Sequence, residues 1–164
     1  MIKVGLFSAT LKQGAPTKTS LAAINMDMYL PLFPLRYLEV QGLGESTLGN
    51  DIRAVSQLND VEVQFEKQPE ENRFIRSDQV NFVANGIPAL AFKFGWTAGS
   101  PEYKAWRGWL AQRYHSTEDD LSQPVDLVAA AQFNSFFADL ARTVADDPAT
   151  PHYLETSFFK RFEK

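Results

Sequence analysis

The sequence SDQVNFVANGIPALAFKF, residues 77–94, places a short helix, a turn and a strand in immediate succession. Ser77 or Asp78 can cap a helix, and Asn85-Gly86 is a typical helix stop. The apolar run 89–94, opened by a proline, predicts a buried strand. A helix that leads directly into a buried strand is typical of an α/β fold.

The same alternation continues on both sides of this stretch. Apolar or alternating runs predict further strands over residues 21–26, 36–41 and 61–65. Three- and four-residue apolar spacing predicts a helix from Ser46 or Thr47 to Leu58, one from Ser100 through Leu110, and a long one after Pro124. The first helix should bury one face, made by Leu48, Ile52, Val55 and Leu58. We therefore expect an α/β protein with a mixed, mainly parallel sheet flanked by helices.

The chain has the length of one domain, and no linker or repeat interrupts it. Its 164 residues can bury a substantial core. We expect a single domain over residues 1–164, in which 146–164 forms a surface tail. Three phenylalanines are expected to anchor that tail: Phe158, Phe159 and Phe162.

Composition excludes several classes of protein. The formal charge of -4 argues against general nucleic-acid binding. The absence of cysteine rules out disulfides, thiolate zinc sites and a cysteine nucleophile. No apolar run is long enough to span a membrane, and the first residues, MIKVGLF, do not form a secretory signal. Localisation stays unknown, because a cysteine-free chain suits either redox environment.

Three residues are candidates for chemistry, each with a simpler alternative. Asp27 follows an apolar strand, where α/β folds place binding groups, but such a carboxylate can equally cap a turn. Asp78 can bind or only cap its helix. His115 lies in the polar loop YHSTEDD with Tyr114, a setting that suits a metal ligand, although many loop histidines are only solvated. Trp106 and Trp109, three residues apart on one face of a predicted helix, should pack in the core.

Four stretches taken together resemble the zinc-dependent aminopeptidase family, which also includes glutamate carboxypeptidase-type enzymes and glutaminyl cyclases. The matching stretches are NMDM at 25–28, RSDQ at 76–79, NGIPAL at 85–90 and YHSTEDD at 114–120. Their order and separation fit the family as well, so the resemblance covers nearly the whole chain.

The resemblance implies an α/β/α sandwich with two zinc ions at the strand ends and a peptide as substrate. It implies that Asp27 binds one zinc and His115 the other, that Tyr114 contacts the substrate or an oxyanion, and that Asp78 lies in the shell of the site. In many relatives a histidine follows the Ser-Asp pair, whereas this chain has Gln79. Relatives are often exported.

The chain also departs from the family. The family requires a His-x-Asp segment followed by a Glu-Glu pair that supplies the general base and a zinc ligand, and neither precedes Asp27 in this sequence. The chain resembles the carboxy-terminal half of a catalytic domain, and the helix that follows Glu-Glu in the family would begin at Gly5-Leu6-Phe7.

Two ligands are too few for a hydrolytic zinc pair. We therefore expect little or no peptidase activity from the chain alone, weak zinc binding, and either self-association or a completing chain. The alternatives are a non-catalytic binding or interaction module that keeps the peptidase fold, and a purely structural α/β domain.

Overall fold

A computed structural model describes residues 3–7 and 20–163 of the chain. Its centre is a five-stranded sheet in the order β1-β2-β5-β3-β4. The pairs β1–β2, β2–β5 and β3–β4 are parallel, and β3–β5 is antiparallel, so the prediction of a mixed, mainly parallel sheet is confirmed. The strands are β1 (Lys3–Phe7), β2 (Ser20–Asn25), β3 (Tyr37–Gln41), β4 (Glu62–Phe65) and β5 (Ala89–Phe94).

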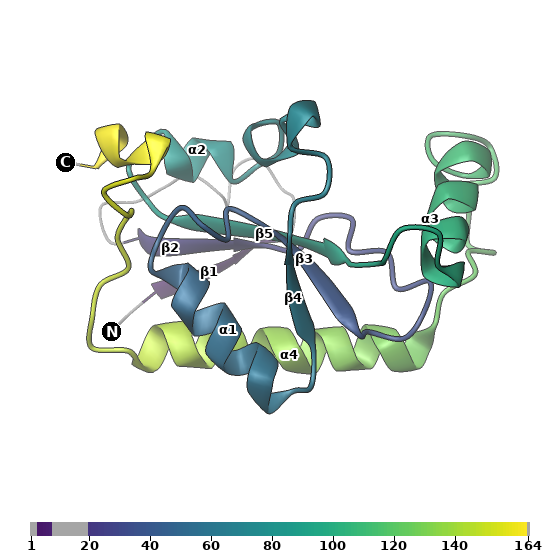
Figure 1. Ribbon diagram of the computed structural model, residues 1–164, viewed down its shortest axis with the longest axis horizontal. Helices are drawn as coiled ribbons and strands as arrows, with labels where there is room; N and C mark the ends of the chain where they lie inside the picture. The colour runs from purple at the N-terminus through teal and green to yellow at the C-terminus, as the bar shows by residue number, and fades with distance from the viewer. Residues whose placement is uncertain (1–2, 8–19, 164) are drawn as a thin grey trace.

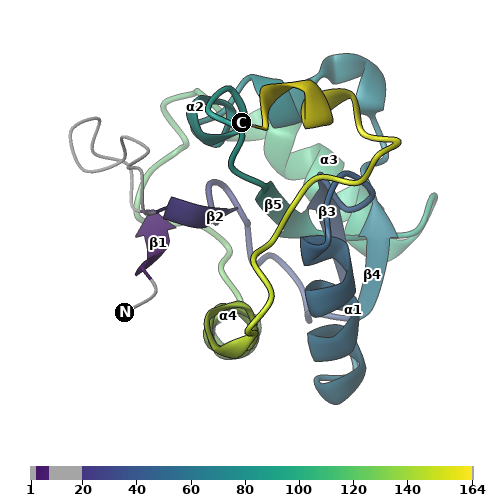
Figure 2. The ribbon, with the colours of Figure 1, turned by 90° about the vertical axis from the view of Figure 1, so that its left-hand side faces the viewer.

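Helices cover both faces of the sheet (Figures 1 and 2). The long helix α4 and the helix α1 pack together on one face, while α2 and the C-terminal segment lie on the other. Helix α3 lies beyond one end of the sheet (Figure 1). The helices are α1 (Leu48–Leu58), α2 (Val80–Val83), α3 (Pro101–Gln112) and α4 (Leu127–Asp146), with 3-10 helices η1 (Pro69–Glu71), η2 (Arg73–Ile75) and η3 (Phe158–Phe162).

One face of the sheet is apolar along β2, β3 and β5. Because side chains alternate along a strand, residues two apart on each strand share this face. These residues join the inward face of α4 in the main core, where burial of apolar surface stabilises the fold. The members include Ile24 of β2, Leu38 and Val40 of β3, Leu90, Phe92 and Phe94 of β5, and Phe133, Phe136 and Leu140 of α4.

The opposite face is divided between an apolar half and a polar half. Ala23 and Ala89 belong to a second, smaller core cluster with Phe82 and Tyr153. Towards the carboxyl end of β2 the same face carries polar side chains instead: Asn25, Glu39, Gln41 and Lys93. The polar half is where a site can form without interrupting the main core.

A stagger between two strands of equal length, β2 and β5, produces a step in the sheet beside this polar half. Strand β2 pairs with β5 only from Ala23 to Asn25, opposite Ala89 to Ala91. Strand β5 continues to Phe94 along β3. The chain leaves the sheet after Asn25 through two residues with left-handed backbone, Met28 and Leu30.

Some expectations about individual elements are wrong. The segment expected to start a helix at Gly5 is strand β1, paired in parallel with β2. Leu58 is 85% exposed, so the buried face of α1 ends before it. Neither Ser77 nor Asp78 caps α2, whose N-cap residue is Gln79 and has no capping side-chain hydrogen bond. Ser100, in contrast, caps α3 by accepting from the Tyr103 N–H at 3.1 Å.

The C-terminal segment contains a core residue that its composition did not reveal. Tyr153 is fully buried, and its hydroxyl donates to the Ile87 carbonyl oxygen at 2.9 Å. Phe159 packs against the same cluster, whereas Phe158, expected as an anchor, is 59% exposed. Within the described part of the chain, none of the helices is both long and apolar enough to cross a membrane.

Candidate active site

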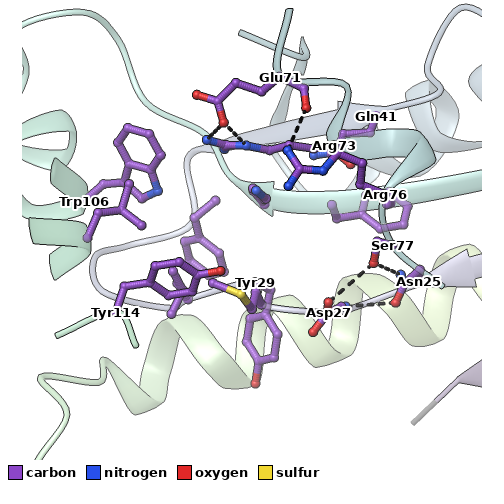
Figure 3. Close-up of a pocket in the computed structure, with 17 residues that line it drawn as sticks. Asn25, Asp27, Tyr29, Gln41, Glu71, Arg73, Arg76, Ser77, Trp106 and Tyr114 are labelled. Carbon is purple, nitrogen blue, oxygen red and sulfur yellow. Dashed lines mark hydrogen bonds and ion pairs between the residues drawn. The ribbon is translucent and has the colours of Figure 1, made fainter. Parts of the chain in front are cut away.

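A cavity of about 300 Å³ lies at the step in the sheet (Figure 3). Its lining comes from the ends of β2, β3 and β5, from η1, η2 and the turn after η2, and from α3 with the loop that follows it. The lining residues that matter for chemistry are Asp27, Glu71, Arg73, Arg76, Ser77, Lys93 and Tyr114.

Asp27 is held in place at the carboxyl end of β2. Its backbone N–H donates to the Asn25 side-chain oxygen at 3.0 Å, which forms a local turn. The Ser77 hydroxyl donates to the Asp27 carboxylate at 3.4 Å. The carboxylate itself is exposed, so it faces the cavity with lone pairs free.

Gln79 supports Asp27 through Asn25. Gln79 is 1% exposed, and its side-chain oxygen accepts from the Asn25 amide at 2.6 Å. The Gln79 amide donates to the Phe74 carbonyl oxygen at 2.5 Å. Because a carbonyl can only accept, these bonds fix the orientation of both amides. The Asn25 oxygen is thereby left for Asp27, and the Asn25 amide also reaches the Ser77 hydroxyl at 3.2 Å.

Three cations line the cavity, and we call them the cationic wall: Arg73, Arg76 and Lys93. Arg73 forms an ion pair with Glu71 at 2.5 Å. Arg76 donates to the Glu71 backbone carbonyl at 3.4 Å. In the view of Figure 3 these arginines lie in the upper part and Asp27 in the lower part.

Lys93 and Glu39 are paired positions on adjacent antiparallel strands. Burial lowers the pKa of Lys93, and the neighbouring Arg73 cation lowers it further, while Glu39, Glu66 and Glu71 act in the opposite direction. Burial likewise raises the pKa of Glu39, an effect opposed by Lys93 and by a hydrogen bond from the Lys67 backbone. The attraction between Lys93 and Glu39 therefore offsets only part of the free-energy cost of burying the two charges.

The structure brings together two of the four residues singled out in the sequence. Asp27 and Tyr114 both line the cavity. His115 is exposed, has left-handed backbone with φ 55°, and stacks its ring on that of Tyr114 at 3.8 Å between centroids. Asp78 is exposed as well, and neither His115 nor Asp78 is among the lining residues.

The residues present do not fit a zinc site by themselves. In the described part of the chain, no three His, Asp or Glu side chains come together in a way that could hold a metal ion. All 20 acidic residues and both histidines lie in that part. Stable zinc sites take three or four protein ligands, so the donor set is short.

Sequence reasoning missed the cationic wall and the amide network. A usable signal for Lys93 was present, since it is the one charge inside the apolar strand ALAFKF. Glu39 is a similar interruption within YLEVQ. No local signal links Asn25 to Gln79, because the two come together only in the fold.

Comparison with known proteins agrees with this architecture. The model of peptidase family M28 matches residues 6–141 of the chain. The chain belongs to this family, whose members are metallopeptidases that generally depend on zinc. No curated protein and no solved structure matched the chain.

Proposed function

We propose that this chain forms part of the substrate and metal site of a zinc-dependent aminopeptidase, and that hydrolysis requires metal donors from outside these 164 residues. The observation that carries the proposal is the shared cavity of Asp27 and Tyr114 at the carboxyl end of β2. A carboxylate and a phenol face the same space there, as a ligand and a substrate contact would.

The chain's own groups limit the chemistry it can perform alone. Asp27 and His115 are the two proposed zinc ligands, and two donors hold zinc weakly. The acidic residues lining the cavity are Asp27 and Glu71, and Glu71 is engaged by Arg73. No lining carboxylate is therefore free to act as a general base once Asp27 binds metal, and we assign no hydrolytic step to this chain.

The remaining lining residues suit the binding of a peptide. The Tyr114 hydroxyl can donate a hydrogen bond to a substrate carbonyl oxygen. Trp106 and Leu110 of α3 add apolar surface to the lining. Asp78 is outside this lining, so its place in the shell of the site stays a prediction.

A completing chain or a second copy is the proposed source of the missing donors. Strand β4 is at one edge of the sheet, and Phe65 at its end is 64% exposed. Leu58, close to it in the chain, is also exposed. An unpaired edge with apolar side chains favours association. Light scattering at high concentration should therefore detect a dimer or larger species, and a strict monomer would count against this proposal.

Zinc analysis and an activity assay test the proposed function together. We expect the purified chain to hold well under one equivalent of zinc after dialysis, and not to hydrolyse an aminoacyl chromogenic substrate. Zinc added in excess should bind weakly, and Asp27→Ala and His115→Ala should each weaken that binding. Asp146→Ala, an exposed carboxylate at the far end of α4, is the matched control. Turnover by the chain alone would overturn the proposal.

One observation favours a second function, a non-catalytic binding module that keeps the peptidase fold. Asp27 is held by groups of the protein itself, the Ser77 hydroxyl and the Asn25 side-chain oxygen. If the chain binds no zinc even when zinc is in excess, or if Asp27→Ala leaves weak zinc binding unchanged, the non-catalytic module is the better description. Retained peptide binding in the cavity would then be its function.

A further inference from the structure

We propose that the cationic wall, made by Lys93, Arg73 and Arg76, binds a carboxylate group of the ligand that occupies the cavity. The inference rests on the proposed function of this cavity in binding peptides, and it adds the class of peptide that the cavity selects.

The three cations converge from separate parts of the fold. Lys93 comes from β5, on the polar face of the sheet, where the step leaves it beside the cavity. Arg73 comes from η2 and Arg76 follows directly after that helix. Surface cations usually separate because they repel each other. Three that line a single cavity therefore indicate a binding role for an anion.

The protein neutralises only part of this charge. Arg73 has an ion pair with Glu71. Among the ion pairs formed by described residues, none includes Lys93 or Arg76. Glu39, opposite Lys93, attracts it together with Glu66 and Glu71, and Glu39 also accepts a hydrogen bond from the Lys67 backbone N–H. The lowered pKa of Lys93 agrees with a cation that is partly buried and crowded by Arg73.

The arrangement of charges in the cavity favours binding of the ligand's carboxylate on the side of the cationic wall. A guanidinium presents paired donors that match the two oxygens of a carboxylate. Asp27, on another part of the lining, would repel the same group. The carboxylate must therefore lie against the cationic wall, with apolar parts of the ligand near Trp106 and Leu110. A volume of about 300 Å³ accommodates a small peptide but not a large one.

Two sources of carboxylate are possible in a peptide, an acidic side chain and the chain terminus. Titration calorimetry with three dipeptides separates them: Ala-Glu-amide has only the side-chain carboxylate, Ala-Gln only the terminal one, and Ala-Gln-amide has neither. We expect at least one carboxylate peptide to bind about tenfold or more tightly than Ala-Gln-amide, as for a charge-assisted hydrogen bond. Raising the salt concentration should reduce that difference.

Variants assign the effect to the wall. Lys93→Met and Arg76→Gln should each remove most of the preference for carboxylate and leave binding of Ala-Gln-amide unchanged. Arg76 is exposed, so its substitution tests the site without disturbing the core. Lys104→Met, at an exposed position on α3, removes the same charge away from the cavity and should have no effect.

The outcomes separate the two proposals. Equal binding of all three peptides, or carboxylate binding that survives both wall substitutions, overturns the carboxylate site alone and leaves the peptide cavity standing. No binding of any peptide, the neutral one included, overturns both. A carboxylate preference lost in Lys93→Met and Arg76→Gln but kept in Lys104→Met supports the inference.

Discussion

The amide of Asn25 lies 2.6 Å from the side-chain oxygen of Gln79, although the two residues are 54 positions apart in the sequence. This contact joins the carboxyl end of β2 to the start of α2. Through it, a fully buried side chain that never reaches the cavity determines how Asp27 is presented.

Replacing Gln79 with alanine should strongly destabilise the protein. The change removes the acceptor of one Asn25 amide bond and the side-chain donor to the Phe74 carbonyl oxygen, at a cost of about 2 to 3 kcal/mol in the free energy of unfolding. Urea denaturation followed by circular dichroism measures the loss. Gln57→Ala, at an exposed position on α1, should stay within about 0.5 kcal/mol of the parent protein. Equal effects of the two substitutions would contradict the network.

Glu39→Gln should change stability in a pH-dependent way. Burial raises the pKa of Glu39 from its ordinary value of 4.5. A carboxyl whose folded-state pKa is raised contributes stability that is present below pH 4.5 and is lost as the pH rises through the folded-state value. Relative to the parent, Glu39→Gln should therefore be more favourable at pH 7 than at pH 4.5. Paired urea titrations at the two pH values measure this difference, with Glu62→Gln on β4 as the control. A difference of the opposite sign would show that Glu39 is stabilised as an anion.

Tyr153→Phe should weaken the attachment of the C-terminal segment. The substitution keeps the buried ring but leaves the Ile87 carbonyl oxygen without its donor, at a cost of about 1 to 2 kcal/mol. Thermal unfolding and limited proteolysis of residues 147–163 measure the effect. Tyr114→Phe, which removes a hydroxyl from a half-exposed residue, should leave the unfolding temperature nearly unchanged and so serves as the control.

Gly42→Ala and Gly99→Ala separate crowding from backbone strain. Both glycines have left-handed backbone, with φ of 80° and 77°. A Cβ at Gly42 would lie 2.7 Å from the Ala89 carbonyl oxygen and 2.8 Å from the Phe74 ring, whereas one at Gly99 would meet nothing within 4 Å. We expect a loss of about 1 kcal/mol for Gly99→Ala and about 3 kcal/mol for Gly42→Ala. Similar losses at the two positions, measured by urea denaturation, would show that the turn at Gly42 relaxes.

Patterns over a few residues predicted most of the fold. The alternation in YLEVQ and the apolar run ALAFKF correspond to β3 and β5, and Ser100 begins α3 as expected. The helix that the family resemblance implied at Gly5-Leu6-Phe7 is strand β1, because this short apolar run, which fits either structure, pairs with β2. Leu58 has the helical spacing of a buried residue, but it lies in the last turn of α1, where the core no longer covers it.

The site was harder to predict because its parts are joined only by the fold. Asp27 and Tyr114 were found through motifs, which preserve local sequence. The contacts that surround them link residues about 50 positions apart, such as Ser77 with Asp27. Arg73 ends a polar stretch, residues 66–73, that composition alone describes as a surface loop, and Arg76 opens the motif RSDQ without any sign of its charged partners. Their meeting with Lys93 depends on where that loop crosses the sheet.

The step between β2 and β5 limits how this site can diversify. The depth of the hollow is set by backbone pairing, because β5 runs on beside β3 after β2 has ended. Point substitutions can therefore alter which molecules are accepted, but they do not move the backbone step that bounds the cavity. Inserting one residue into β2 would turn Asn25 towards the apolar face, and inserting two would extend β2 into the open space. New specificities on this scaffold must therefore arise by exchanging the side chains that line the cavity, while the backbone step stays the same.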